Sequence, residues 1–287
     1  MSRRLCLLGA GMIAALSAPG RTQINPPDVA TGIVQQIDAA LAVDDLSTAA
    51  AIIARNATTL PIARVGLAHA DYALAAGDNE AALTAYLALV SDAALAARVQ
   101  LGIGLAQLRL GRDAIALPAL DAATRADPSS VRAWVARGVL ADRQRDWITA
   151  DLSYDRALAL DTRSSAALTN RGYSRLLRGR FAEAVADSTQ ALSIDPKIAA
   201  ASNNLRLARA LLGDYKDAFA GSTKTSLPND LNTVGFAAMS RGDYATAETY
   251  FTRAMQLNPK FDRTAWDNLV YLKQLTHTPV EPGPRQR

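Results

Sequence analysis

Side chains that commonly carry chemistry are scarce in this sequence. It holds one cysteine, Cys6, and two histidines, His69 and His277, among 287 residues. A single cysteine excludes an intramolecular disulfide and a thiolate zinc site. With so few histidines, neither a Ser-His-Asp catalytic set nor a histidine-based metal site can be assembled convincingly. We therefore expect no cofactor, no bound metal and no enzyme activity.

Aromatic residues and unbalanced charge are also lacking. Aromatics make up 6% of the chain, and 31 basic residues are interspersed with 27 acidic ones, for a net charge of +4. This pattern forms no basic stripe, so nucleic acid is not an expected partner. Apolar residues make up 49% of the chain, with alanine the most frequent, which suits closely packed helices better than strands.

The first residues have the order of a secretory signal peptide. Arg3 and Arg4 precede an apolar run from Leu5 to Leu16, and small residues follow the run. We expect a signal peptide over residues 1–17, with Ala18 as the new N-terminus, and an irregular linker over 18–29. Loss of the two arginines lowers the net charge from +4 to +2. The general secretory route is favoured over twin-arginine export, because the aromatic residue usual after the arginines is absent.

The same segment allows two other interpretations. The apolar run is too short for an ordinary membrane span, but an uncleaved anchor is an alternative, and it would be the only contact with a membrane. Residues 9–14 also fit the form of a dinucleotide-binding fingerprint, but Pro19 and Pro26 interrupt the helix and strand that it requires. Export predicts a periplasmic or envelope-associated protein.

Small residues recur along the chain every 34 residues, as at Gly104, Gly138 and Gly172. Two further columns keep this step, with one step of 29 near the end: alanines at Ala82, Ala116, Ala150, Ala184, Ala218 and Ala247, and turn residues at Gly77, Gly111, Arg145, Gly179, Gly213 and Gly242. A fixed period of this length indicates an array of stacked repeats.

Each repeat is predicted to be a pair of helices. In residues 131–164, apolar and small residues recur at three- and four-residue steps on both sides of a turn at Arg145-Asp146, as amphipathic helices require. Prolines such as Pro128 and Pro196 punctuate the ends of the units, because proline cannot continue a helix interior.

The glycine and alanine columns, with the Gly-Asp-Tyr turns at 213–215 and 242–244, resemble the tetratricopeptide repeat (TPR) family. The resemblance covers residues 30–261 and implies an all-α superhelical solenoid of about seven helix-turn-helix repeats with a C-terminal capping helix. The units are expected near 30–62, 63–96, 97–130, 131–164, 165–198, 199–227 and 228–261, the cap at 262–275, and a disordered tail at 276–287. The unit from residue 199 is about five residues short, so we expect a truncated second helix there and a kink or change of pitch.

The resemblance also implies a binding surface, since first helices line the concave face of such arrays. It places six candidate contact residues there: Asn170, Tyr173, Asn203, Asn204, Asn232 and Phe236. Asparagine offers a donor and an acceptor to the backbone of an extended peptide, and the two aromatics add apolar contact area. Three arginines toward the other end of this face, Arg98, Arg132 and Arg143, favour an acidic segment.

Other polar residues receive a structural interpretation. Arg137 and Arg171 stand where many repeats have leucine, and we favour ion pairs within the array, such as Arg171 with Asp187, over anion binding. His69 is interpreted as a packing residue. Carboxylate pairs one helical turn apart, such as Asp142/Asp146 and Asp151/Asp155, are interpreted as exposed helix surface.

Three functional hypotheses follow. The first is a non-catalytic scaffold of the bacterial envelope that binds a protein or peptide segment in the concave groove. Residues 232–263, the leader and the short unit resemble TPR proteins of bacterial Tad/Flp pilus-assembly clusters, which implies a place in pilus or secretion assembly. The second is a structural array that self-assembles into a homo-oligomer. The third is an enzyme that uses a carboxylate pair.

Overall fold

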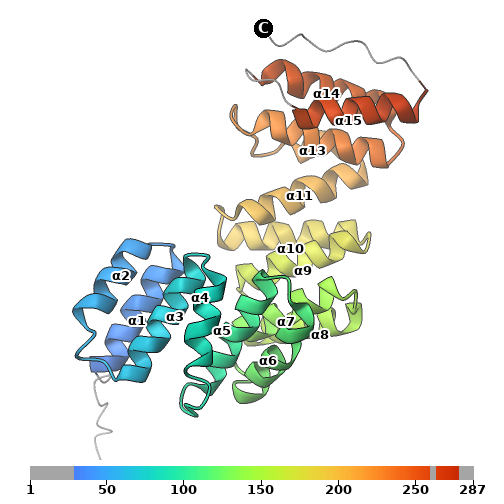
Figure 1. Ribbon diagram of the computed structural model, residues 1–287. Helices are drawn as coiled ribbons and strands as arrows, with labels where there is room; N and C mark the ends of the chain where they lie inside the picture. Colours follow the sequence, from blue (N-terminus) through green and yellow to red (C-terminus); the bar gives the residue numbers. More distant parts are fainter. Residues whose placement is uncertain (1–28, 259–262, 278–287) are drawn as a thin grey trace, which may run out of the picture.

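The computed structural model describes residues 29–258 and 263–277, and in these residues every regular element is an α-helix (Figure 1). The helices are α1 (Val29–Ala42), α2 (Leu46–Arg55), α3 (Ile62–Ala75), α4 (Asn79–Leu87), α5 (Ala96–Arg109), α6 (Asp113–Ala126), α7 (Val131–Arg143), α8 (Trp147–Leu160), α9 (Ser165–Leu177), α10 (Phe181–Ile194), α11 (Ala199–Leu212), α12 (Tyr215–Ala218), α13 (Leu227–Ser240), α14 (Tyr244–Leu257) and α15 (Arg263–Leu275). The fold is thus a series of seven helix pairs, α1–α2 to α13–α14, closed by a single helix, as predicted.

Some predictions fall on residues that the structure does not describe. The leader over 1–17, most of the linker over 18–29 and most of the tail over 276–287 lie outside the described ranges. Among the described residues, no helix combines the length and apolarity that crossing a bilayer requires.

Each helix pair turns through one residue in the left-handed backbone region. Glycine occupies this position in five of the pairs, but Arg145 has φ 57° and Asp44 also has φ 57°. The arginine that breaks the glycine column in the sequence therefore adopts the same backbone conformation as the glycines it replaces. The side chains of Asp45, Asp78 and Asp146, each next in the chain, then cap the following helix by accepting a backbone N–H.

Small residues set the spacing within the pairs. A Cβ atom built on Gly138 would lie 2.6 Å from the ring of Tyr154, and one built on Gly235 would lie 2.7 Å from the ring of Phe251. Gly104 makes the same approach to Leu120. These second-helix side chains, like the alanines Ala116, Ala150, Ala184 and Ala247, are fully buried. The glycine column thus lets each bulky side chain lie directly against the backbone of its paired helix.

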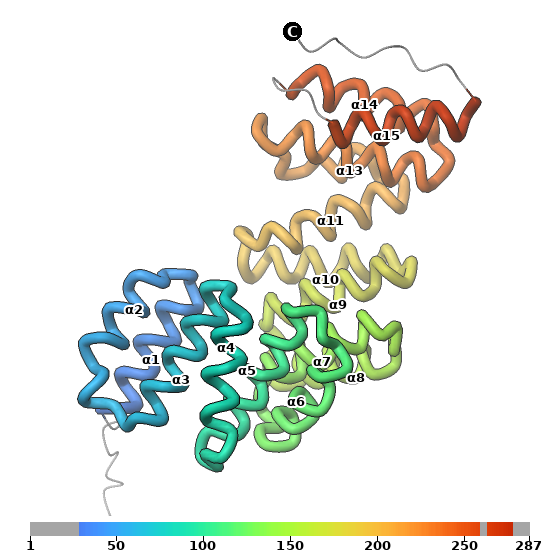
Figure 2. Tube along the Cα trace, viewed as in Figure 1, coloured from blue at the N-terminus to red at the C-terminus, as the bar shows by residue number. Residues whose placement is uncertain are grey.

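The stacked pairs form an elongated, bent array. In Figures 1 and 2, α1 to α8 lie along one limb, and α9 to α15 continue along a second limb at an angle to the first. The change of direction lies near α7–α10, and therefore ahead of the short unit where the kink was expected. At its C-terminal end the array is covered by α15, whose Ala265 and Leu272 are buried.

The short unit is truncated as predicted, because its second helix, α12, has 4 residues. Its first helix carries Arg206 in the column that holds Gly138 and Gly172 in the preceding units. The Arg206 side chain is buried and pairs with Asp230 of α13 at 3.0 Å, with both side chains less than a tenth exposed. An arginine leaves no room for a second helix to approach closely, and its own side chain links α11 to α13 instead.

Removal of Arg206 should therefore destabilise the array strongly. We expect Arg206→Ala to lower the free energy of unfolding by about 3–5 kcal/mol, because Asp230 remains buried without its cation. Replacing both partners by apolar residues, Arg206→Met with Asp230→Leu, should recover most of this loss. Urea unfolding monitored by circular dichroism checks both, and an Arg206→Ala variant as stable as wild type would contradict the structural role.

Candidate functional site

A large hollow lies along the first helices of the N-terminal limb. The hollow has a volume of about 850 Å³ and is lined by residues of the first helices α1, α3, α5, α7 and α9, together with the end of α6. Two of the predicted site residues, Arg98 and Arg132, line it, and the other seven do not. The hollow therefore lies within units one to five, ahead of most of the asparagine-rich stretch.

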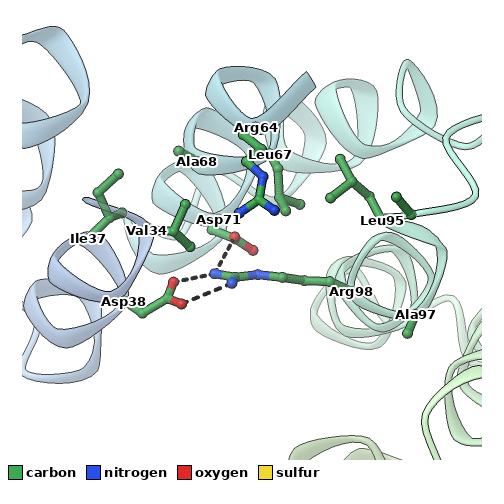
Figure 3. A pocket seen from close by; sticks show the side chains of 11 residues that line it. Val34, Ile37, Asp38, Arg64, Leu67, Ala68, Asp71, Leu95, Ala97 and Arg98 are labelled. Carbon is green, nitrogen blue, oxygen red and sulfur yellow. Dashed lines mark hydrogen bonds and ion pairs between the residues drawn. The ribbon is translucent and has the colours of Figure 1, made fainter. Parts of the chain in front are cut away.

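Arg98 lines the hollow and belongs to an ion cluster, which Figure 3 shows beside a smaller adjoining cavity. Its guanidinium forms two hydrogen bonds with Asp38 of α1 and an ion pair of 2.7 Å with Asp71 of α3. The Tyr86 hydroxyl of α4 donates to the other Asp71 oxygen at 2.5 Å. Arg98 thus ties the first three units together through ion pairs inside the protein, and its contact with an acidic segment of a partner stays a prediction.

Burial shapes the electrostatics of this cluster. Desolvation raises the pKa of Asp71, and Arg98 opposes that rise only in part. Desolvation and the adjacent Asp71 also raise the pKa of Tyr86, which holds the phenol as a hydrogen-bond donor. The cluster accordingly holds one shared cation between two carboxyl groups.

A smaller cavity of about 200 Å³ adjoins the cluster between α1, α3 and α5. Its walls are mostly apolar, with Val34, Leu67 and Leu95 around the two aspartates. Figure 3 shows the Arg64 guanidinium extending toward this cavity on the Asp71 side. Arg64, Asp38 and Asp71 were missed from the sequence. The sequence did contain one indication. Asp71 is acidic, whereas the residues at the same repeat position in later units include Leu105, Val139 and Tyr173.

Arg143 also makes contacts inside the array. Arg143 donates to the carbonyl oxygen of Leu108 at 2.7 Å and to Asp113 at 3.0 Å. Arg109 donates in the same way to the Leu74 carbonyl, and Arg241 to the Leu211 carbonyl at 2.7 Å. Each of these arginines binds the C-terminal end of the preceding first helix, where a positive charge is favourable. Arg143 is therefore a link between units, and its contact with a partner stays a prediction.

Arg132, in contrast, is available. Its side chain is exposed at the start of α7 and lines the large hollow. No hydrogen bond or ion pair joins it to any residue of the described ranges, although its charge lowers the pKa of Tyr86 slightly against the dominant effect of burial. Among the three predicted arginines, it is the one that faces the hollow with an uncommitted charge.

The predicted asparagines are mostly engaged. Asn204 is buried, and its amide donates to the carbonyl oxygen of Thr169 at 3.1 Å, which corrects its assignment to an open peptide-binding row. Asn170 donates to Ala166 one turn earlier in its own helix. Asn232 accepts from Asn268 of the cap, whereas Asn203 is exposed and accepts from Arg206. Asn204 and Asn232 thus connect helices, Asn170 and Asn203 bond within their own helices, and of the four Asn203 is the one mainly open to solvent.

Two predicted aromatics remain exposed. Tyr173 on α9 and Phe236 on α13 each leave about half of their surface open, at 50% and 49%. They occupy the same column of first helices, separated by one full and one short repeat step. They lie outside the large hollow, so they mark a separate apolar stretch farther along the array.

The structural interpretation of Arg137 and Arg171 is confirmed. Arg171 binds Asp187 of its own unit and Asp155 of the preceding second helix, both at 2.8 Å. Arg137, one repeat earlier, binds Asp121 at 2.8 Å and Ser153 at 3.3 Å in the equivalent directions. The two arginines therefore bridge successive second helices.

The carboxylate pairs do not form a shared site. Asp151 binds Arg178 at 2.6 Å, and Asp155 binds Arg171. Asp146 caps α8, while the buried Asp142 accepts from Tyr154 at 2.7 Å and from Ser174 at 2.6 Å. In the described ranges no three His, Cys, Asp or Glu residues are grouped as metal ligands. His69, expected to pack, is exposed instead.

Asp142 should make stability depend on pH in a defined direction. Burial raises its pKa above the usual value of 3.8, so its contribution to folding is fully present below that value and is lost as the pH rises through the raised pKa. The melting temperature of Asp142→Asn minus that of wild type should therefore increase between about pH 4 and pH 7.

Asp151→Asn serves as a control of opposite sign. The hydrogen bond from Arg178 lowers the pKa of Asp151, so its carboxylate stabilises the fold at neutral pH, and this contribution is lost as the pH falls. The melting temperature of Asp151→Asn minus that of wild type should therefore decrease as the pH rises. Equal pH profiles for the two variants would contradict the assigned environments.

The comparisons with known proteins agree on the repeat. Family models described as tetratricopeptide repeat match residues 67–114, 114–161 and 231–261. Among curated proteins, no sequence matches this chain. The units outside the matched ranges are established by the helix pairs of the structure itself.

Solved structures with a similar fold include other helical-repeat proteins. A chain of the APC/C hetero-tetramer Cut9–Hcn1 has a TM-score of 0.68 at 16% identity over 87% of this chain, which spans 50% of the Cut9–Hcn1 chain. A tetratricopeptide repeat protein from Parabacteroides merdae has a TM-score of 0.52 at 15% identity and covers 84% of this chain and 97% of its own. PilW, a widely conserved type IV pilus biogenesis factor, has a TM-score of 0.50 at 19% identity, with 63% and 86% covered. At these identities the likeness shows the fold, a TPR solenoid.

Proposed function

We propose that this TPR solenoid is a non-catalytic scaffold whose N-terminal hollow holds a segment of a partner protein. The observation that carries the proposal is the hollow of about 850 Å³ across five first helices, into which Arg132 presents a charge without an internal partner. TPR proteins generally act as protein-binding scaffolds without catalysis. The extent of the hollow along the array suits an extended segment better than a small molecule.

The charges of the hollow indicate what kind of segment fits. The cluster of Arg98 with Asp38 and Asp71 is internally paired, so Arg132 is the cation of the hollow that has no ion pair or hydrogen bond among the described residues. It lies at the start of α7, where a carboxylate of the partner also meets the free N–H groups of the helix end. An acidic residue of the partner segment is therefore expected at Arg132. Farther along the array, Tyr173 and Phe236 offer exposed aromatic surface to its apolar side chains.

We further propose that the protein works in the bacterial cell envelope, within pilus or secretion assembly. The order of charge and hydrophobicity in residues 1–17 supports export. The sequence resemblance to TPR proteins of Tad/Flp pilus clusters supports the pilus assignment. The fold that the chain shares with PilW, a pilus biogenesis factor, is compatible with it.

Reversal of charge at Arg132 tests the hollow. We expect Arg132→Glu to weaken partner binding about tenfold or more, because an acidic segment then meets a like charge. The measurement is a pull-down from envelope extract, followed by titration of the recovered partner segment at two salt concentrations. Arg156→Glu on α8 is the matched control, since Arg156 is exposed but does not line the hollow. Equal binding by both variants would place the partner elsewhere.

A further inference from the structure

One edge of the N-terminal limb exposes several large apolar side chains. Because paired helices are antiparallel, the starts of first helices and the ends of second helices lie at the same edge of the array, as Figure 1 shows for α1, α3 and α4. Four large apolar side chains are exposed there, namely Val29 (69%), Ile62 (91%), Leu87 (51%) and Val90 (52%). We call these four residues the N-terminal edge. None of them lines the hollow proposed to bind a partner.

The N-terminal edge differs from the same edge of the later units. Units three to five end in polar connections that start at Asp127, Asp161 and Asp195, and no large apolar residue is exposed in them. The connection between α4 and α5 reads instead Ala-Leu-Val-Ser-Asp-Ala-Ala-Leu over residues 88–95. Large apolar side chains clustered at a protein surface commonly mark an interaction site.

The charges beside this edge are mainly positive. Arg55 is exposed in the last turn of α2, and Arg64 lies in the first turn of α3. Neither forms a hydrogen bond or ion pair with any described residue. The connection after α4 contains one acid, Asp92, which accepts from the backbone N–H of Ala94 at 3.0 Å. Apolar side chains next to arginines are the combination that binds the surface of an anionic membrane.

The place where residues 1–28 join the array also favours a membrane surface as the binding partner of this edge. Val29, the first described residue, lies at this edge, so residues 1–28 join the array there. That segment carries Arg3, Arg4 and the apolar run from Leu5 to Leu16. In the alternative in which the leader is not cleaved, this run is short for a membrane span but has the apolar and basic character of an interfacial anchor. An uncleaved leader would bring the edge to the same surface, whereas after cleavage the edge would bind by itself.

We propose that the N-terminal edge docks on the surface of an anionic lipid bilayer. Val29, Ile62, Leu87 and Val90 enter the boundary between headgroups and acyl chains, and Arg55 pairs with lipid phosphates. A second copy of this chain is a less suitable occupant, because two edges with Arg55 and Arg64 repel each other. Residues 18–28 are also less suitable, because they are largely polar. Docking in this way would hold the N-terminal limb beside the membrane.

Co-sedimentation with vesicles tests the proposal. The probes are vesicles of phosphatidylethanolamine with phosphatidylglycerol and vesicles of phosphatidylcholine alone, with the full chain whose N-terminus has been checked by mass spectrometry. We expect Ile62→Asp with Val90→Asp to lower the partition coefficient on the anionic vesicles about tenfold. The loss is measurable even with the leader present, because the factors by which edge and leader raise the partition coefficient multiply. Ile148→Asp with Leu152→Asp is the matched control, because these α8 residues are also exposed, at 77% and 66%, but lie away from the edge. The control should bind within twofold of wild type.

The remaining outcomes are decisive. Equal binding by wild type and both double variants would overturn the proposal, because the leader alone would then account for it. Equal binding to phosphatidylcholine would overturn the part assigned to Arg55. Sedimentation equilibrium that shows a wild-type dimer, lost only in the Ile62/Val90 variant, would assign the edge to a second copy instead. Unchanged thermal unfolding of the variants excludes misfolding as a cause, as their exposed positions lead us to expect.

Discussion

Close approach within each helix pair is the constraint on which the rest of this structure depends. Gly104, Gly138 and Gly235 bring the backbone of a first helix against a bulky side chain of the second, and buried alanines keep the pairs close. An isolated pair leaves one face uncovered, so each unit needs its neighbours, and the array closes only where α15 covers the last pair. The concave surface exists because this packing repeats.

Polar contacts then determine how the units follow one another. Arg109, Arg143 and Arg241 bind the ends of preceding first helices, and Arg137 and Arg171 bridge second helices. The cluster around Arg98 joins three units at the hollow. The unit of Arg206 differs from the others. Its glycine position holds an arginine, its second helix is nearly absent, and an ion pair between Arg206 and Asp230 links α11 to α13. Many of the charged residues on this array thus stabilise its shape.

Local patterns predicted the fold, and long-range contacts decided the site. The 34-residue step, the turn residues and the short unit are local features, so the helix pairs and the truncated α12 followed from the sequence. The partners of Arg98 did not, because Asp38 lies 60 residues away and reaches it only through the superhelical stacking of three units. For the same reason Asn204 looked like a surface residue from its repeat position, although the neighbouring helix buries it.

The most direct test of the close-approach constraint compares two glycines in helices. Gly138 faces Tyr154, whereas a Cβ on Gly32 of α1 would meet nothing within 4 Å. We predict that Gly138→Ala lowers the free energy of unfolding by about 1–3 kcal/mol because of overpacking. Gly32→Ala should raise it by about 0.5–1 kcal/mol, since alanine favours the helix. Changes of opposite sign in the free energy of unfolding, measured by chemical denaturation, would support the account. A stabilising Gly138→Ala would contradict it.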